Sequence, residues 1–150
     1  MKILRPLIAL LPLLILTNVA SAEVVVKDAW ARATVPQQRA TGVFMQLQSD
    51  KEVRLMDVQS TAAGMAGVHE MQMENNVMKM REVLQLTIPA GKNIEFKPGG
   101  LHVMLMDLKS QAKEGDIIPL KFIFEAKDKK QQTVEIKVKV KGITATDGKM

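Results

Sequence analysis

Residues 117–141 read IIPLKFIFEAKDKKQQTVEIKVKVK, and this stretch decides the fold class. Apolar side chains occupy every second position in two sets, first Ile118, Leu120, Phe122 and Phe124, and then Val134, Ile136, Val138 and Val140. Glutamate and lysine fill the alternate positions of the second set. Because successive side chains of a strand point to opposite faces, the pattern predicts two strands with one face in a core and the other in water.

The rest of the chain repeats this alternation in shorter runs that are separated by turn residues. We expect strands at residues 24–32, 40–48, 52–59, 68–73, 77–84 and 101–108, with a further short strand around Ile94 and Phe96. Residues 60–67 are expected to be a small-residue connection, and Glu74-Asn75-Asn76 is expected to be a hairpin turn. Eight or nine short strands with little helical periodicity predict an all-β fold, a Greek-key antiparallel β-sandwich.

The first 22 residues have the features of a cleaved signal peptide. Lys2 and Arg5 precede an apolar run from Pro6 to Leu16, and the small residues of Ala20-Ser21-Ala22 suit leader peptidase. We therefore expect residues 1–22 to be a leader, residues 23–141 to be the β-sandwich domain and residues 142–150 to be a C-terminal tail. This predicts export to the periplasm, with no membrane span after leader cleavage because no later apolar run is long enough.

Composition excludes several classes of function. Removal of Lys2 and Arg5 lowers the formal net charge from +5 to +3, and the chain has only four Phe, one Trp and no Tyr, so nucleic acid is not an expected partner. The absence of cysteine excludes disulfides, a thiol nucleophile, a cysteine zinc site, a lipoprotein anchor and a blue-copper centre. Two histidines within one motif and no glycine-rich phosphate loop give no catalytic set, so we do not expect an enzyme.

Methionine is abundant, with 11 residues, and both histidines have a methionine two positions later. The two motifs are His69-Glu70-Met71 and His102-Val103-Met104, and side chains at this spacing share one face of a strand. Leu101, Val103 and Leu105 form the expected core face, so His102, Met104 and Met106 should lie on the opposite face. We therefore expect that His102 or Met104 can be replaced with little loss of stability.

Imidazole and thioether together favour one metal. Thioether is a soft, neutral donor that selects Cu(I) over Zn²⁺, Mg²⁺ or Ca²⁺, and imidazole also accepts Cu(I). Methionine also fills cores, which is the expected role of Met45 and Met56. A second interpretation therefore stays open, in which the protein is a secreted β-sandwich interaction module with an exposed methionine patch.

Residues 69–115 resemble the PCuAC family of periplasmic copper(I) chaperones. They read HEMQMENNVMKMREVLQLTIPAGKNIEFKPGGLHVMLMDLKSQAKEG. The family signature is a histidine, a methionine eleven residues later, and a His-x-Met that begins a further twenty-two residues on. In this chain the signature is matched in full by His69, Met80, His102 and Met104.

The resemblance implies a cupredoxin-like sandwich that binds one Cu(I) per chain near its surface. Its ligands would be His69, Met80, His102 and Met104, with Met71 as a substitute or companion, a choice that the sequence leaves open. It implies copper delivery for cytochrome c oxidase assembly, to an oxidase subunit or to a Sco-type thiol chaperone, by a protein expected to be a monomer. Residues 142–150 contain no histidine and one methionine, so they lack the His/Met-rich extension to which a further Cu(II) site is ascribed in the family.

Overall fold

The computed structural model describes residues 21–146, and all regular structure in that range is β-strand. The strands are β1 (Val24–Arg32), β2 (Ala40–Ser49), β3 (Val53–Gln59), β4 (Ala63–Glu74), β5 (Val77–Val83), β6 (Leu86–Ile88), β7 (Asn93–Phe96), β8 (Leu101–Leu108), β9 (Ile117–Ala126) and β10 (Gln131–Lys141). The all-β prediction is confirmed, with ten strands rather than eight or nine. Residues 1–20 of the predicted leader and 147–150 of the predicted tail lie outside the described residues.

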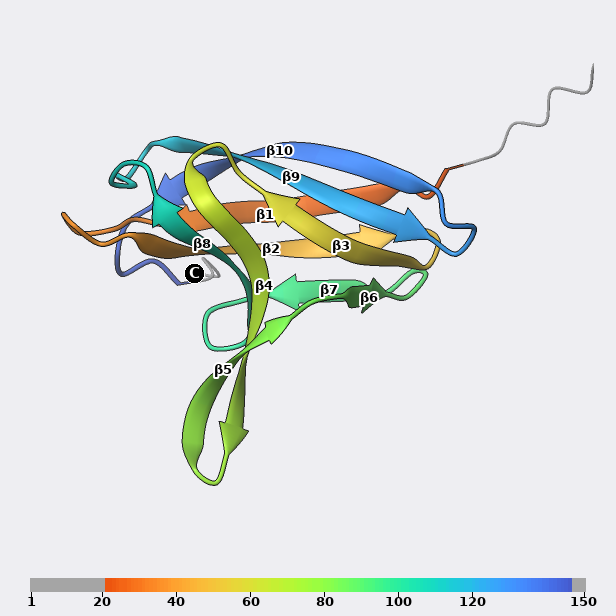
Figure 1. The fold of residues 1–150 in the computed structure, drawn as a ribbon, viewed down its shortest axis with the longest axis horizontal. Helices are drawn as coiled ribbons and strands as arrows, with labels where there is room; N and C mark the ends of the chain where they lie inside the picture. Colours follow the sequence, from red (N-terminus) through yellow and green to blue (C-terminus); the bar gives the residue numbers. More distant parts are fainter. Residues whose placement is uncertain (1–20, 147–150) are drawn as a thin grey trace, which may run out of the picture.

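The strands form one hydrogen-bonded ladder that folds over into a sandwich (Figure 1). Their order is β5-β4-β8-β2-β1-β10-β9-β3-β6, and β7 also pairs with β2. Strand β3 does not stay beside β2 but pairs with β9, which is the kind of crossover that a Greek key requires. The pairing of β1 with β10 is parallel, which departs from the predicted antiparallel pattern. Between residues 21 and 146 we find no helix with the length and apolar character that crossing a bilayer requires.

The core follows the alternation in β9 and β10. Phe122 and Phe124 of β9 are fully buried, as is Val138 of β10, whereas Lys137 and Lys139 between the valines are exposed. These side chains pack in one apolar cluster with residues of β2, β3 and β8. Met45 of β2 lies in the same cluster, so its predicted role as a core filler is confirmed.

Strand β4 begins at Ala63, within the segment that was predicted to be a connection. A Cβ atom on Gly64 would lie only 2.6 Å from Oδ2 of Asp107 on neighbouring β8. The small residue is therefore needed for close strand packing. Residues 60–62 still connect β3 to β4, but the predicted connection through residue 67 was wrong because composition does not separate a loop from a tightly packed strand.

The β4–β5 hairpin extends away from the sandwich (Figure 1). Its turn residues Asn75 and Asn76 have φ values of 51° and 62°, a conformation that asparagine tolerates and that two-residue hairpin turns require. The predicted turn is confirmed. It fixes the register of β5 against β4 from Glu74↔Val77 to Val68↔Val83.

Candidate metal centre

Strand register brings all five candidate ligands to one face of β5, β4 and β8. His69 lies directly opposite His102 in the β4–β8 pair, and Met71 lies directly opposite Met80 in the β4–β5 pair. Met71 is two residues from His69, and Met104 is two residues from His102, so each shares the face of its histidine. Positions far apart in the sequence are therefore neighbours on the sheet.

This face is opposite the core, as predicted, but it is not uniformly exposed. Val68 and Val103 are paired on the core side and are buried. His102 on the other side is only 6% exposed, whereas Met104 is half-buried. The expectation that His102 can be replaced without loss of stability does not fit this burial, because its ring is packed on both sides.

A row of rings crosses the outer face and covers His102. The centroid of the His102 ring lies 6.1 Å from that of His69, with 22° between the planes, and 6.4 Å from that of Phe44. Trp30 continues the row, with its centroid 4.7 Å from Phe44. The guanidinium carbon of Arg32 lies 5.3 Å from the centre of the Phe44 ring. Although Trp30 and Phe44 are each only 4% exposed, they belong to this outer row and not to the core cluster.

The carbonyl of Gly100 fixes the orientation of the His102 ring. It accepts hydrogen bonds from His102 Nδ1 at 2.9 Å and from the Met71 backbone N–H at 3.2 Å. Since a carbonyl can only accept, Nδ1 carries the proton and Nε2 keeps its lone pair. Metal-binding histidines commonly have this arrangement.

His69 supplies a second free nitrogen. Its Nδ1 is buried and has no hydrogen-bond partner among the described residues. An unpaired buried polar atom is costly, and binding to an ion would remove that cost. The site therefore offers one imidazole lone pair from β8 and an unpartnered imidazole nitrogen from β4.

Two glycines leave room around Met104. Gly42 of β2 and Gly67 of β4 lie directly opposite Met104 on its two neighbouring strands. A Cβ atom on Gly42 would lie 2.9 Å from Cζ of Phe44, and one on Gly67 would lie 3.7 Å from Cε1 of His69. The rings of Phe44 and His69 therefore occupy space over the two glycines that flank Met104 in the sheet.

The methionines complete a soft donor set. Met71 is half-buried and Met80 is 49% exposed. They lie directly opposite each other on the ligand face, so the structure leaves both available as ligands. Among residues 21–146, no group of three or more His, Cys, Asp or Glu side chains could hold a metal ion. A centre at the two histidines would therefore require sulfur. A groove of about 700 Å³ lies elsewhere, beside β9 and β10, and no candidate ligand lines it.

Comparison with known proteins gives the family. The sequence pattern of the LpqE-like family, described as "Putative lipoprotein LpqE-like", matches residues 24–140. The chain belongs to the LpqE-like family. It is 30% identical to the uncharacterized protein RP573 of Rickettsia prowazekii over 125 residues, which cover 79% of this chain and 68% of that protein.

Solved structures similar to this LpqE-like chain include PCuAC domains. The copper-bound PCuAC domain from PmoF2 superimposes with a TM-score of 0.64 at 21% identity, covering 79% of this chain and 92% of that domain. The Cu(I)-bound solution structure of DR1885 from Deinococcus radiodurans superimposes with a TM-score of 0.54 at 30% identity, covering 78% of this chain and 76% of that one. The predicted resemblance to the PCuAC family and the predicted cupredoxin-like sandwich are both confirmed.

Sequence analysis of this LpqE-like chain missed the residues that support the two histidines. Gly100 was only one position of the quoted stretch 69–115, and Phe44 was only one position of the expected strand 40–48. Trp30 and Phe44 are among five aromatic residues in the chain. That scarcity was the available signal, but their packing against His102 depends on strand order, which the sequence did not reveal.

Proposed function

We propose that this protein is an extracytoplasmic carrier of Cu(I), which binds one ion through His69, His102, Met104 and one or both of Met71 and Met80. The observation that carries the proposal is the pairing of His69 with His102 in register, with an unpaired buried nitrogen on the first and a free Nε2 on the second. The methionines share their face. The likeness to a copper-bound PCuAC domain supports the same cargo.

The charges beside the site are of both signs, because Glu82 of β5 lies directly opposite His69, whereas two cationic side chains lie beside the ring row. Arg32 lies over Phe44 and Trp30, and Lys141 Nζ lies 5.2 Å from the centre of the Trp30 ring. Every proposed ligand is neutral, so the protein supplies no negative charge from the ligands themselves. The preference for Cu(I) therefore comes from the soft thioether sulfurs.

Exposure along the site suits transfer to another protein. His102 is buried, Met71 and Met104 are half-buried, and Met80 is 49% exposed. An acceptor's ligands can therefore displace the methionine side of the site first while the histidines still hold the ion. This is the behaviour of a carrier and not of an enzyme. We propose that the acceptor serves cytochrome c oxidase copper-centre assembly, as an oxidase subunit or a Sco-type thiol chaperone.

Copper uptake tests the proposal directly. The purified protein should compete with a chromogenic Cu(I) chelator under reducing conditions and take up one equivalent, with both nitrogen and sulfur neighbours in its X-ray absorption spectrum. A spectrum with no sulfur neighbours, or the absence of stoichiometric uptake, would contradict the proposal. Transfer is then tested by mixing the loaded protein with a copper-free soluble oxidase domain and measuring copper in each after separation.

The pH dependence of binding tests the histidines. Imidazole must be neutral to bind Cu(I), whereas thioethers do not titrate, so the affinity should fall as the solution is made acidic. Chelator competition between about pH 7.5 and pH 5 measures this fall. A flat profile would exclude His69 and His102 as principal ligands.

The exposed methionines favour a second candidate function, that of a protein-interaction module. Met65, Met73, Met78 and Met80 are all among the exposed large apolar side chains. Such a patch could bind a partner without any metal. The two functions separate in the same copper titration, because an interaction patch alone predicts no stoichiometric Cu(I) uptake.

A further inference from the structure

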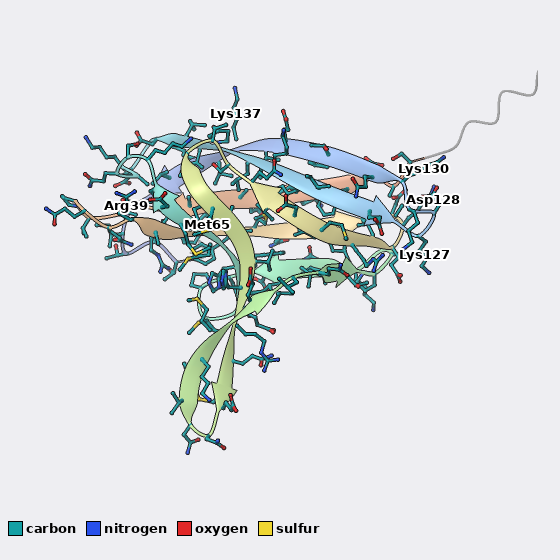
Figure 2. All side chains as sticks on the ribbon, in the orientation of Figure 1. Arg39, Met65, Lys127, Asp128, Lys130 and Lys137 are labelled. Carbon is teal, nitrogen blue, oxygen red and sulfur yellow. The ribbon has the colours of Figure 1, made fainter. Side chains whose placement is uncertain are left out.

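The outer face carries more sulfur than one copper site needs. Beyond Met71 and Met80, the next residues on this face of the hairpin are Met73 and Met78, which lie directly opposite each other. At the other end of β4, Met65 lies opposite Met106 of β8. Figure 2 shows Met65 where β4 crosses the sandwich, so the sulfur-bearing positions extend from the sandwich to the hairpin.

The two faces of the hairpin differ in chemistry. On one face, Gln72 Nε2 donates to Glu70 at 2.9 Å, and Lys79 Nζ pairs with Glu74 at 3.0 Å. The other face presents the methionine pairs. Figure 1 shows the hairpin projecting from the sandwich, and Figure 2 shows its side chains extending into the open. Met73 and Met78 are 64% and 45% exposed, so core filling does not explain them.

The register allows these sulfurs to reach one ion. Side chains directly opposite each other in an antiparallel pair have Cβ atoms about 5 Å apart, and the next pair on the same face is about 7 Å along the strand. The sulfur of methionine lies two bonds beyond Cβ on a flexible stem. The turn at Asn75 and Asn76 holds Met73 opposite Met78.

We infer that the end of the hairpin is a second soft-metal site, made only of thioethers, in which Met73 and Met78 bind Cu(I) or Ag(I), with a third ligand from whichever of Met71 and Met80 the histidine centre leaves free. Metal binding by the hairpin does not depend on the proposed function, but its role in transfer does. If the protein carries Cu(I), an acceptor would first meet the ion at this solvent-facing site. We expect it to fill after the histidine centre, because Met73 and Met78 are more exposed than His102.

Silver titration followed by NMR tests the site. Ag(I) is the probe because it is soft, monovalent and redox-stable, and methionine labelled with ¹³C at its ε-methyl gives one signal for each residue. In the wild-type protein the first equivalent should shift the Met104 signal, and the second should shift the signals of Met73 and Met78. If saturation leaves the Met73 and Met78 signals unmoved, the inference is overturned.

Variants separate the two sites. Met73→Leu with Met78→Leu should weaken the second binding event by about tenfold or more and leave the first intact. Met45→Leu, a buried control on β2, should change neither event. His69→Ala with His102→Ala should abolish the first event and keep the Met73 and Met78 shifts, and the wild-type titration still decides if this variant is unfolded. If the wild-type protein shows no first binding event, the proposed function is wrong. If it shows the first event but not the second, only this inference is wrong.

Discussion

The two faces of β8 differ in the burial and the chemistry of their side chains. On the core face, Val103 and Leu105 have no exposed surface and no polar atoms in their side chains. On the outer face, His102, Met104 and Met106 carry lone pairs, and exposure rises from a buried ring to half-buried thioethers. The first face stabilises the sandwich, and the second places donor atoms at an accessible surface. Alternation therefore places the apolar core side chains and the candidate donor atoms on opposite faces of one strand, and His102 is the outer-face residue that is also buried.

The largest effect on stability should come from the core face. Leu105→Ala removes a fully buried side chain and should lower the free energy of unfolding by about 2–5 kcal/mol. Chemical denaturation measures the loss, and Met106→Leu on the other face of the same strand is the control, with a change of less than about 1.5 kcal/mol. Equal losses would show that the faces are not distinct.

His102→Ala should affect both properties because the ring is buried although it faces outward. We expect Cu(I) affinity to fall by about 100-fold or more as one ligand is lost. The cavity beside Phe44 should also lower the free energy of unfolding by about 1–3 kcal/mol. Phe44→Leu is the control, since it disturbs the same packing and keeps every donor atom. Wild-type affinity in His102→Ala would remove His102 from the site.

Met104→Leu should affect binding alone. The swap conserves volume at a half-buried position, so the free energy of unfolding should change by less than about 1.5 kcal/mol. Loss of the thioether should weaken Cu(I) binding by about 10- to 100-fold. Chelator competition and thermal unfolding measure the two quantities. A Met104→Leu variant with clearly lower stability but wild-type Cu(I) affinity would show that Met104 stabilises the fold and is not a ligand.

The smallest effect is expected at Glu125 of β9, which belongs to neither face of β8. Burial raises the pKa of this carboxyl, but Arg54 Nη2 at 2.7 Å and Lys129 Nζ at 3.5 Å outweigh it and leave the pKa below 4.5. A lowered pKa stabilises the fold above the ordinary value, and the contribution is lost as the pH falls through the folded pKa. Glu125→Gln should therefore lower Tm near neutral pH by about 2 °C or less, and the difference should shrink as the pH falls through the folded pKa. A difference that does not shrink with acidification would have a cause other than charge, and Glu135→Gln, at an exposed position, is the control.

Alternation allowed much of the fold to be predicted from the sequence. Strands 24–32 and 101–108 have the predicted bounds, although β1 contains a bulge between Lys27 and Trp30 that the alternation did not predict. The start of β4 was wrong because Gly64 packs against Asp107 of a strand more than forty residues away. Such a contact leaves no local signal in the sequence.

The candidate site, like the fold, could be predicted only in part from the sequence. That His69 and His102 carry methionines on the same face followed from local spacing, but their mutual register did not, since it depends on which strands pair. The burial of His102 depends on Phe44, and the orientation of its ring depends on the backbone of Gly100. Neither could be deduced from the residue types at positions 102–104.

The hydrogen bond from His102 Nδ1 to the Gly100 carbonyl has a consequence for the chemistry of loading. The bond selects one tautomer of the neutral ring, in which Nε2 is the nitrogen that keeps its lone pair. It also holds the ring in one orientation. Copper can therefore bind and leave this position without a change of tautomer or a rotation of the ring.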